Sequence, residues 1–218
     1  MTKAIVLLSG GIDSTVVLAL ALSHGKNCYA LSFNYGQKHI VELEAAKEIA
    51  KYYKVPHHII NIDPKAFGKS SLVSNIESPK ERSLEEMITK GIPNTYVPAR
   101  NTLFLAFALG QCELHEAQEI HFGSNLMDYA CYPDCRPTYM QAYQSLMNLA
   151  TKQAVEGNPP SLITPLIYFD KKSIIKKGLS LGAPLELTIS CYNPIDRHTP
   201  CNQCDACILR NMGFAEVS

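Results

Sequence analysis

The stretch AIVLLSGGIDSTVVLAL, at residues 4–20, decides the fold. Its first five residues, 4–8, form a continuous apolar run, which is typical of a parallel strand that is covered on both faces. The motif SGG at residues 9–11 breaks this run. Apolar residues then crowd one helical face from Asp13 onward, and Gly25 is placed as a helix stop. The pattern predicts a strand, a glycine-rich turn and a helix.

The glycine-rich turn is suited to binding phosphate. Two glycines let backbone N–H groups approach an anion closely, and the N-terminus of the following helix adds unpaired donors. The sequence contains neither GxxxxGK[ST] nor GxGxxG, which excludes the two better-known phosphate loops. An ordinary strand-to-helix turn is the alternative. We interpret Asp13 as a Mg²⁺ partner or an orienter of the loop, or as a plain helix-terminal charge.

Strand and helix patterns alternate along the rest of the chain. Strands are expected at residues 28–33, 57–62 and 119–123, a strand or extended segment at 162–167, and helices at 41–53, 101–114, 139–152 and 171–182. This alternation predicts an α/β fold, a Rossmann-like parallel sheet with helices on both faces, over residues 1–189. Residues 68–92 are polar and weakly patterned, and we expect a mobile loop with one or two helical turns that could act as a lid.

The last four of the eight cysteines are spaced for a metal. Cys191, Cys201, Cys204 and Cys207 supply four thiolates, which satisfy a tetrahedral Zn²⁺ and leave no open position, so the site would be structural. An iron–sulfur cluster competes, because C-x2-C-x2-C also begins a ferredoxin sequence, but residue 211 is Asn where that sequence has cysteine. Zinc is therefore favoured, and chance clustering of buried cysteines is the remaining alternative. We predict a small zinc-binding segment at residues 190–218, packed on the main domain.

Composition narrows the class of partner. Lys and Arg together number 20, as do Asp and Glu, so the formal net charge is +0. Enzymes that act on nucleic acids usually have a basic excess on one face, so the balance favours a small-molecule substrate and no nucleic acid. The apolar runs are shorter than the roughly 20 residues of a membrane span. We predict a cytoplasmic protein with no membrane partner.

Two further segments offer polar groups for a substrate. Arg100 and Asn101 open a predicted helix after an extended segment, where a guanidinium could meet a phosphate or a carboxylate, or lie on the surface. Tyr132, Asp134 and Arg136 combine a ring, an acceptor and a fork of donors, which suits a flat purine-like base that bears a carboxylate. Asp134 would accept from a guanine-like edge, and Arg136 would hold the carboxylate.

Several motifs resemble known families. SGGxDS after a first strand resembles the signature of the N-type ATP pyrophosphatases, which cleave ATP between its α and β phosphates. Other motifs, in chain order, are similar to the 7-cyano-7-deazaguanine synthase family, or QueC family: SFNYGQKH at 32–39, TYVPARN at 95–101, DYACYPDCRP at 128–137, TPL at 164–166, ELTISC at 186–191 and CNQCDAC at 201–207. The likeness runs nearly end to end.

This resemblance implies a function. It implies an adenine nucleotide alpha hydrolase-like fold and a ligase that forms C–N bonds, converting 7-carboxy-7-deazaguanine and ammonia to the 7-cyano product with ATP, a step in queuosine biosynthesis. ATP, Mg²⁺ and one structural Zn²⁺ per chain are the implied cofactors, and a homodimer is the implied assembly. Cleavage of ATP to AMP is expected, with cleavage to ADP through an acyl phosphate as the alternative.

Motifs and resemblance together give the candidate residues. Lys171 matches a family lysine expected to meet pyrophosphate, although a solvated pair with Lys172 would look the same. The catalytic candidates are Asp13, Lys171 and Arg136. The nucleotide-binding candidates are Leu8, Ser9, Gly10, Gly11, Ile12, Asp13, Ser14, Thr15, Val16, Val17, Leu18, Arg100 and Lys171. The substrate-binding candidates are Tyr35, Gln37, Asn101, Tyr132, Asp134 and Arg136, and the metal ligands are Cys191, Cys201, Cys204 and Cys207.

A tRNA sulfur-inserting enzyme of the same ATP fold is the alternative function. It would need a basic face, an RNA-binding domain or a catalytic cysteine pair, for which Cys131 and Cys135 are candidates. We otherwise interpret these two, with Cys28 and Cys112, as small buried hydrophobic residues. A non-enzymatic zinc-binding module would leave the phosphate loop unexplained.

Overall fold

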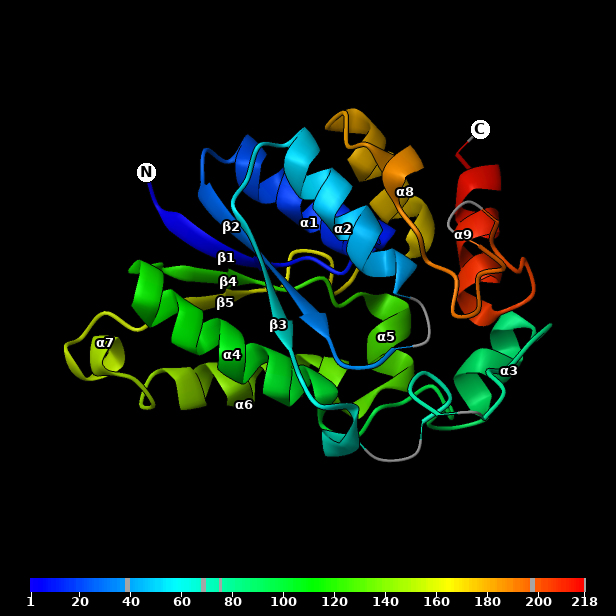
Figure 1. The fold of residues 1–218 in the computed structure, drawn as a ribbon, viewed down its shortest axis with the longest axis horizontal. Helices are drawn as coiled ribbons and strands as arrows, with labels where there is room; N and C mark the ends of the chain where they lie inside the picture. The colour runs from blue at the N-terminus through cyan, green and yellow to red at the C-terminus, as the bar shows by residue number, and fades with distance from the viewer. Residues whose placement is uncertain (38–39, 68–69, 75, 197–198, 218) are drawn as a thin grey trace.

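The computed structural model describes residues 1–37, 40–67, 70–74, 76–196 and 199–217. In this part of the chain a parallel five-stranded sheet runs through the centre, in the order β3-β2-β1-β4-β5 (Figure 1). The strands are β1 Lys3–Leu7, β2 Asn27–Asn34, β3 His57–Asn61, β4 Glu119–His121 and β5 Ser161–Ile163. Because β1 pairs with β2 on one side and β4 on the other, the strand order reverses at β1, where α/β proteins form their ligand crevice.

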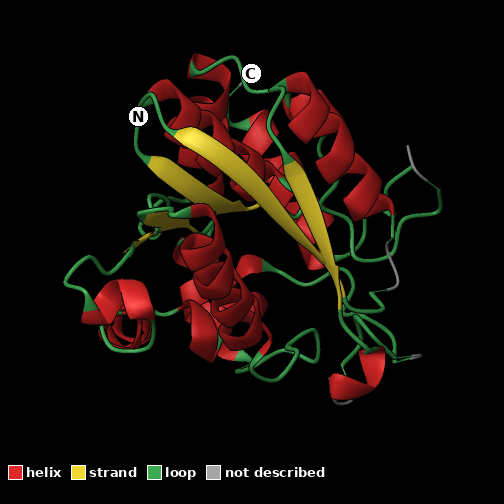
Figure 2. Cartoon of the chain, turned by 60° about the vertical axis from the view of Figure 1, so that its left-hand side comes forward, coloured by secondary structure: helices red, strands yellow, loops and turns green. Residues whose placement is uncertain are grey.

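Helices cover both faces of the sheet, as the sequence predicts. Side chains of β1 alternate between the faces: Ala4 and Val6 join one hydrophobic core, and Ile5 and Leu7 join the other. Over the first face lie α1 Ile12–Ser23, α2 Val41–Tyr52 and α8 Lys171–Ser180, and over the second lie α4 Arg100–His115 and α6 Pro137–Met147 (Figures 1 and 2). Burial on both sides explains the unbroken apolar run of β1.

Two glycines allow three helices to pack closely against one another. A Cβ on Gly178 of α8 would lie 2.8 Å from Val16 Cγ2 of α1. A Cβ on Gly213 of α9 (Asp205–Ala215) would lie 2.9 Å from Lys171 Cγ. The helices α1, α8 and α9 therefore pack in series, and the last of them supports Lys171.

Several predicted elements end earlier than their sequence patterns indicate. The strand predicted at 119–123 ends at His121, and the one predicted at 162–167 ends at Ile163, where the chain turns and the Ile167 N–H donates to the Thr164 carbonyl. The helix predicted at 139–152 ends at Met147. After it, Thr151 caps the separate helix α7 Lys152–Val155 by accepting from the Ala154 N–H.

The described residues of the polar stretch 68–92 contain one short helix, and the second half of the stretch is anchored to the C-terminal segment. Ser83 and Glu86 form a capping box at the start of α3 Leu84–Thr89, which matches the predicted one or two helical turns. Arg82 forms an ion pair with Asp205, and the Glu81 N–H donates to the Gln203 carbonyl at 2.8 Å. Lid motion of this stretch would have to break these contacts.

The remaining elements are short, and α5, like α9, was not predicted. They are α5 Leu126–Cys131 and three 3₁₀ turns at Pro64–Ala66, Pro133–Cys135 and Leu185–Leu187. None of the described helices is long and apolar enough to cross a membrane. Lys38 and His39 of the motif SFNYGQKH, and residues 68, 69 and 75 of the polar stretch, lie outside the described residues.

Candidate active site

The glycine-rich turn joins β1 to α1 and is held by its own hydroxyl groups. The Ser9 N–H donates to Ser14 Oγ at 3.1 Å, and the two serine hydroxyls lie 3.0 Å apart. Ser14 and Thr15 donate their hydroxyls to the Gly11 carbonyl at 3.1 and 2.8 Å. These bonds fix the loop while leaving the N-terminal N–H groups of α1 free to face a ligand.

Gly10 has a different role from the one expected from the sequence. Its φ is +91°, and a Cβ there would lie 2.2 Å from the Glu42 carbonyl oxygen and 2.9 Å from the Ala46 nitrogen. Gly10 therefore serves the close packing of the loop against α2. Gly11, with φ −84° at the N-cap of α1, lines the cavity instead.

Only part of the predicted nucleotide segment reaches the cavity. Leu8, Ser9, Gly11, Ile12, Asp13 and Ser14 line it. Thr15, Val16, Val17 and Leu18 are fully buried inside α1, where three of them pack in the hydrophobic core. These four residues hold the helix on the sheet rather than meeting a ligand.

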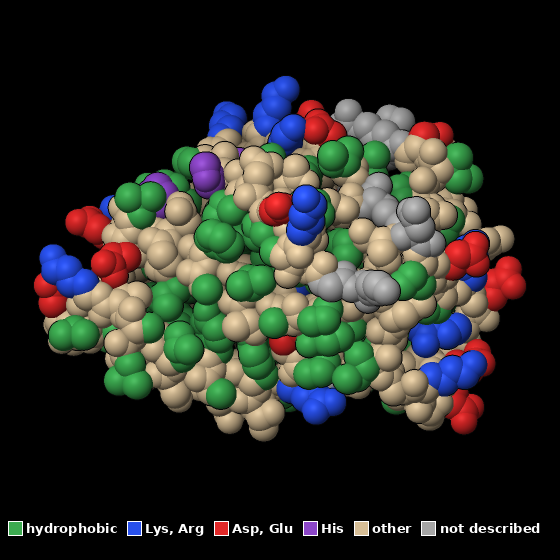
Figure 3. Space-filling view, turned by 60° about the horizontal axis from the view of Figure 1, so that its bottom comes forward, with side chains coloured by type: hydrophobic (Ala, Val, Ile, Leu, Met, Phe, Trp, Pro, Cys, Tyr) green, Lys and Arg blue, Asp and Glu red, His purple; other side chains and the backbone are tan. Residues whose placement is uncertain are grey.

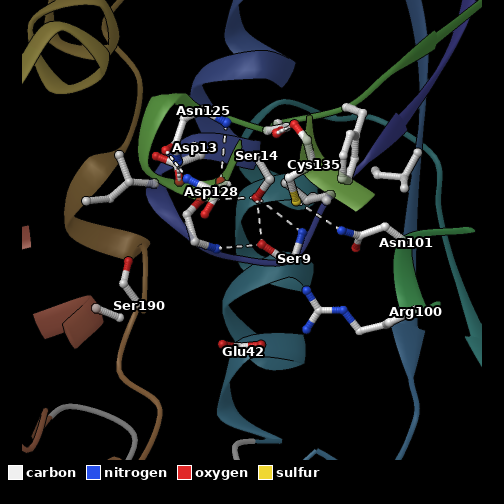
Figure 4. A pocket seen from close by; sticks show the side chains of 18 of the residues that line it. Ser9, Asp13, Ser14, Glu42, Arg100, Asn101, Asn125, Asp128, Cys135 and Ser190 are labelled. Atoms are coloured by element: carbon white, nitrogen blue, oxygen red, sulfur yellow. Dashed lines mark hydrogen bonds between the residues drawn. The ribbon is translucent and has the colours of Figure 1, made fainter. Parts of the chain in front are cut away.

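The cavity lies at the carboxyl edge of β1, β2 and β4 and has a volume of about 280 Å³ (Figure 4). Its lining comes from the phosphate loop, from Leu31, Phe33 and Tyr35 of β2 and its end, from residues 122–125 after β4, and from α4, α5 and α8. Residues 189, 190 and 192, with three residues of α9, close one side. The sheet and the C-terminal segment thus share one site.

One end of the cavity carries two carboxylates and one lysine. Lys171 Nζ contacts both carboxylate oxygens of Asp13, at 2.6 and 2.8 Å, and Asn125 Nδ2 donates to Asp13 at 3.0 Å. The neighbouring Asp128 has a pKa raised to about 7, by burial and by the charge of Asp13. Two carboxylates beside a phosphate loop form a donor set that Mg²⁺ shares with phosphate oxygens.

Arg100 and Tyr35 lie in another part of the cavity. Arg100 begins α4 after Ala99, whose φ of 54° turns the chain into the helix. Its guanidinium donates to Tyr35 Oη at 3.2 Å and lies 5.8 Å from the centres of the Tyr35 and Phe104 rings, while its Nε is buried without a partner among the described residues. Of its three nitrogens, only Nη1 has a hydrogen-bond partner among the described residues.

The other substrate candidates divide into lining and supporting residues. Tyr132, Asn101 and Gln37 line the cavity, and Gln37 also holds the end of β2 by donating to the Phe33 carbonyl and accepting from the Tyr35 N–H. Asp134 does not line it, because its carboxylate is occupied by the Asn101 N–H at the start of α4. Arg136 is exposed and lies outside the lining.

The four C-terminal cysteines meet as their spacing predicts. The sulfur atoms of Cys191, Cys201, Cys204 and Cys207 all lie within 4.8 Å of one another. Backbone N–H groups donate to three of these sulfurs: Cys191 Sγ accepts at 3.2 and 3.3 Å, Cys201 Sγ at 3.4 Å and Cys204 Sγ at 3.4 Å. Such donors stabilise thiolate charge, so the cluster could bind a metal ion.

Several residues that line the cavity were missed by sequence reasoning. They include Glu42, Asn125, Asp128, Ser190 and Tyr192. Asp128 begins the quoted motif DYACYPDCRP, and Ser190 precedes the first cysteine of the cluster. Their place in or beside these motifs could have marked both as candidates. Glu42 has no such neighbour.

The whole chain resembles one family of proteins. The sequence model of the family described as "Queuosine biosynthesis protein QueC" matches residues 3–218. The 7-cyano-7-deazaguanine synthase of Desulfatibacillum aliphaticivorans is 52% identical over 217 residues, which cover 99% of this chain and 93% of that protein. The 7-cyano-7-deazaguanine synthase of Cellvibrio japonicus is 48% identical and covers 99% of this chain and 94% of its own.

Solved structures share the fold at low sequence identity. The U34-tRNA thiolase NcsA of Methanococcus maripaludis, with its [4Fe-4S] cluster, aligns with a TM-score of 0.51 at 15% identity over 99% of this chain and 70% of that one. A 4-thiouridine synthetase in complex with RNA and ATP aligns with a TM-score of 0.51 at 18% identity, over 98% of this chain and 53% of that one. These likenesses place the sheet among the adenine nucleotide alpha hydrolase-like folds and carry nothing further.

The two loop glycines should respond differently to alanine. Gly10→Ala combines a positive φ with a backbone clash and should cost about 3 kcal/mol or more of folding free energy. In Gly11→Ala the nearest atom to the new methyl is Ser9 Oγ at 3.4 Å, so the protein should fold normally and bind ATP more weakly. Thermal melting and ATP titration measure the two effects. A stable Gly10→Ala protein that has lost only ATP binding would contradict this division of roles.

Proposed function

This chain belongs to the QueC family of queuosine biosynthesis proteins and is an enzyme of the 7-cyano-7-deazaguanine synthase type, and we propose that it activates its substrate by transferring AMP from ATP. The substrate is 7-carboxy-7-deazaguanine, and ammonia supplies the nitrile nitrogen. The observation that carries the proposal is that the phosphate loop, Lys171 and several apolar and aromatic side chains line one cavity.

Adenylation solves the chemical problem of the reaction. A carboxylate is a poor electrophile, and hydroxide is a poor leaving group. Attack of the carboxylate on the α-phosphorus of ATP releases pyrophosphate and gives an acyl adenylate, which ammonia converts to an amide with loss of AMP. A second adenylation, at the amide oxygen, then allows loss of AMP and of the nitrogen-bound protons to form the nitrile. The reaction as a whole uses two ATP molecules for each nitrile.

The chain's own groups bind the departing pyrophosphate. The N–H groups at the start of α1 and the ammonium of Lys171 offset its negative charge, and Asp13 orients Lys171 before the nucleotide enters. Asp13 and Asp128 would hold Mg²⁺, which supplies further charge neutralisation on phosphate oxygens. Tyr35, Gln37, Asn101 and Tyr132, which line the cavity, are proposed to surround the bases of nucleotide and substrate.

The cysteines outside the cluster argue against sulfur transfer. Cys131 donates to the Met87 carbonyl and does not line the cavity, whereas Cys135 lines it and accepts from Asn101 Nδ2. Burial raises the pKa of both thiols, so neither is a ready thiolate nucleophile. Together with the synthase relatives, this favours nitrile synthesis over tRNA thiolation.

For the cysteine cluster we propose one zinc ion with a structural role. A tetrahedral ion with metal–sulfur distances of about 2.3 Å has sulfur–sulfur edges of about 3.8 Å, and the Cys201 and Cys207 sulfurs lie 4.0 Å apart. In a four-iron cluster each thiolate binds a different iron, which would spread the sulfurs further. The ion would hold residues 190–218, proposed as a distinct segment, against the main domain at 1–189.

We also propose that the enzyme is a cytoplasmic homodimer. All eight cysteines are free of disulfides, which suits a reducing compartment. Figure 3 shows apolar side chains gathered on the face of α4 and α6. Leu103, Phe107 and Leu114 are exposed by 38, 42 and 70% along α4, at helical spacing, and a Cβ at Gly110 among them would meet no atom within 4 Å. A second copy packed on this face would bury it.

Product analysis tests adenylation. The enzyme supplied with 7-carboxy-7-deazaguanine, ATP, Mg²⁺ and ammonium should release two AMP and two pyrophosphate for each nitrile, as measured by chromatography and a pyrophosphate assay. Asp13→Asn should slow this turnover with little change in melting temperature, because it weakens the hold on Lys171. ADP and phosphate as the products would show that the substrate is activated as an acyl phosphate instead.

Elemental analysis tests the metal. The purified protein should contain about one zinc per chain and no visible absorption. Cys204→Ser should lose zinc and make residues after 190 sensitive to protease before the sheet, because metal binding free energy at such sites is also folding free energy. Cys131→Ser is the matched control and should keep its zinc. Stoichiometric iron and sulfide, or full zinc in Cys204→Ser, would contradict the proposal.

Light scattering with size-exclusion chromatography tests the dimer. The wild type should elute as a dimer, and Phe107→Glu should be a monomer because a carboxylate would be buried in the apolar contact. Leu179→Glu, at a residue 52% exposed on α8, is the control and should remain dimeric. A monomeric wild type would contradict the proposed dimer, and a dimeric Phe107→Glu would show that α4 is not in the interface.

A further inference from the structure

One ionisable side chain of the cavity has no part in the chemistry described above. Glu42 lies in the first turn of α2 and lines the cavity, away from the cluster of Asp13, Asp128 and Lys171. Figure 4 shows the Glu42 and Arg100 side chains facing the same part of the pocket. A carboxylate and a guanidinium therefore stand together at a part of the site that binds no phosphate in this account.

The Glu42 carboxylate has no hydrogen-bond partner among the described residues, but the backbone that carries it is held in place. Among the residues that the structure describes, none donates a hydrogen bond to it or forms an ion pair with it within 4.0 Å, and burial raises its pKa to about 8 although Arg100 opposes the rise. Its backbone carbonyl is packed against Gly10. A half-buried carboxyl group without a partner takes up a proton instead of carrying its charge, and N–H donors from an occupant of the cavity would favour the ionised form.

Arg100 supplies the complementary group. One terminal nitrogen is held by Tyr35 Oη and the guanidinium lies near two aromatic rings, which fix its direction, while Nε has no partner among the described residues. Apolar side chains of Leu31, Phe33, Leu43 and Phe104 line the cavity as well. This part of the cavity therefore combines apolar walls with one acceptor and one donor that face it together.

Two kinds of base must enter this enzyme, and only one matches the pair. A guanine-type edge presents a carbonyl oxygen, a ring N–H and an exocyclic amine in a row. A carboxylate can accept from the last two while a guanidinium donates to the first. An adenine edge presents an amine beside an unprotonated ring nitrogen, and that nitrogen would face the carboxylate without a proton between them.

We propose that Glu42 selects the guanine-type base, accepting hydrogen bonds from its ring N–H and exocyclic amine while Arg100 donates to its carbonyl oxygen. This inference rests on the proposed function, because it requires a deazaguanine substrate in the cavity. It transfers to Glu42 the recognition of a guanine-like edge that the sequence assigned to Asp134, whose side chain does not line the cavity.

The test compares Glu42→Gln with Glu44→Gln, a neighbouring acidic residue whose carboxylate pairs with Lys47 at an exposed position. Binding of 7-carboxy-7-deazaguanine, and of its analogue without the exocyclic amine, is measured by calorimetry in the presence of a non-hydrolysable ATP analogue. Affinity for the ATP analogue is measured separately, and nitrile formation by the wild type is followed by chromatography. Melting temperature verifies that each variant is folded.

Glu42→Gln should weaken binding of the substrate by roughly 10- to 100-fold, since the charge is lost and one of the two acceptor oxygens becomes an NH₂ donor. Its affinity for the ATP analogue should be unchanged, and the wild type's preference for the amine-bearing base should disappear. Glu44→Gln should match the wild type. Unchanged substrate binding in Glu42→Gln, or a loss confined to the ATP analogue, would overturn the inference. Selective base binding without nitrile formation would instead refute the proposed function and leave the role of Glu42 standing.

Discussion

The close packing of Gly10 against the first turn of α2 is the constraint on which the site depends. With no side chain at residue 10, the phosphate loop approaches the Glu42 carbonyl more closely than any Cβ would allow. The contact sets the height of the loop above the sheet, and therefore the direction of the α1 N–H groups. It also fixes the backbone from which the Glu42 side chain enters the cavity. One glycine thus fixes the position of the phosphate loop relative to Glu42.

The second constraint comes from the end of the chain. Residues 189–192 and three residues of α9 form a wall of the cavity, and α9 packs through Gly213 onto Lys171. The cysteine cluster lies between these two segments and also adjoins the polar stretch, through a backbone bridge between Lys80 and Cys204. A metal in the cluster would therefore act on catalysis indirectly, through the shape of this wall and the support of Lys171.

The sequence predicted the fold and the local motifs well, because each depends on neighbouring residues. The strand at 4–8, the turn after it and the four clustered cysteines are set by local pattern and short spacing. Asp134 and Arg136 could not be placed in this way, since side-chain direction within a 3₁₀ turn depends on the packing of α4 and α6. In the sequence, Glu42 is one of two acidic residues in a helical first turn and is indistinguishable from Glu44; the packing of α2 on the phosphate loop decides which of them lines the cavity.

The central claim is that one cavity holds the nucleotide at the phosphate loop and the substrate base at Glu42 and Arg100. A crystal structure of the protein with 7-carboxy-7-deazaguanine and a non-hydrolysable ATP analogue measures this directly. The phosphates should lie at the N-terminus of α1 beside Lys171, and the ring N–H and amine of the substrate should lie within hydrogen-bond distance of the Glu42 carboxylate. Adenine on Glu42, or a substrate base bound outside this cavity, would contradict it.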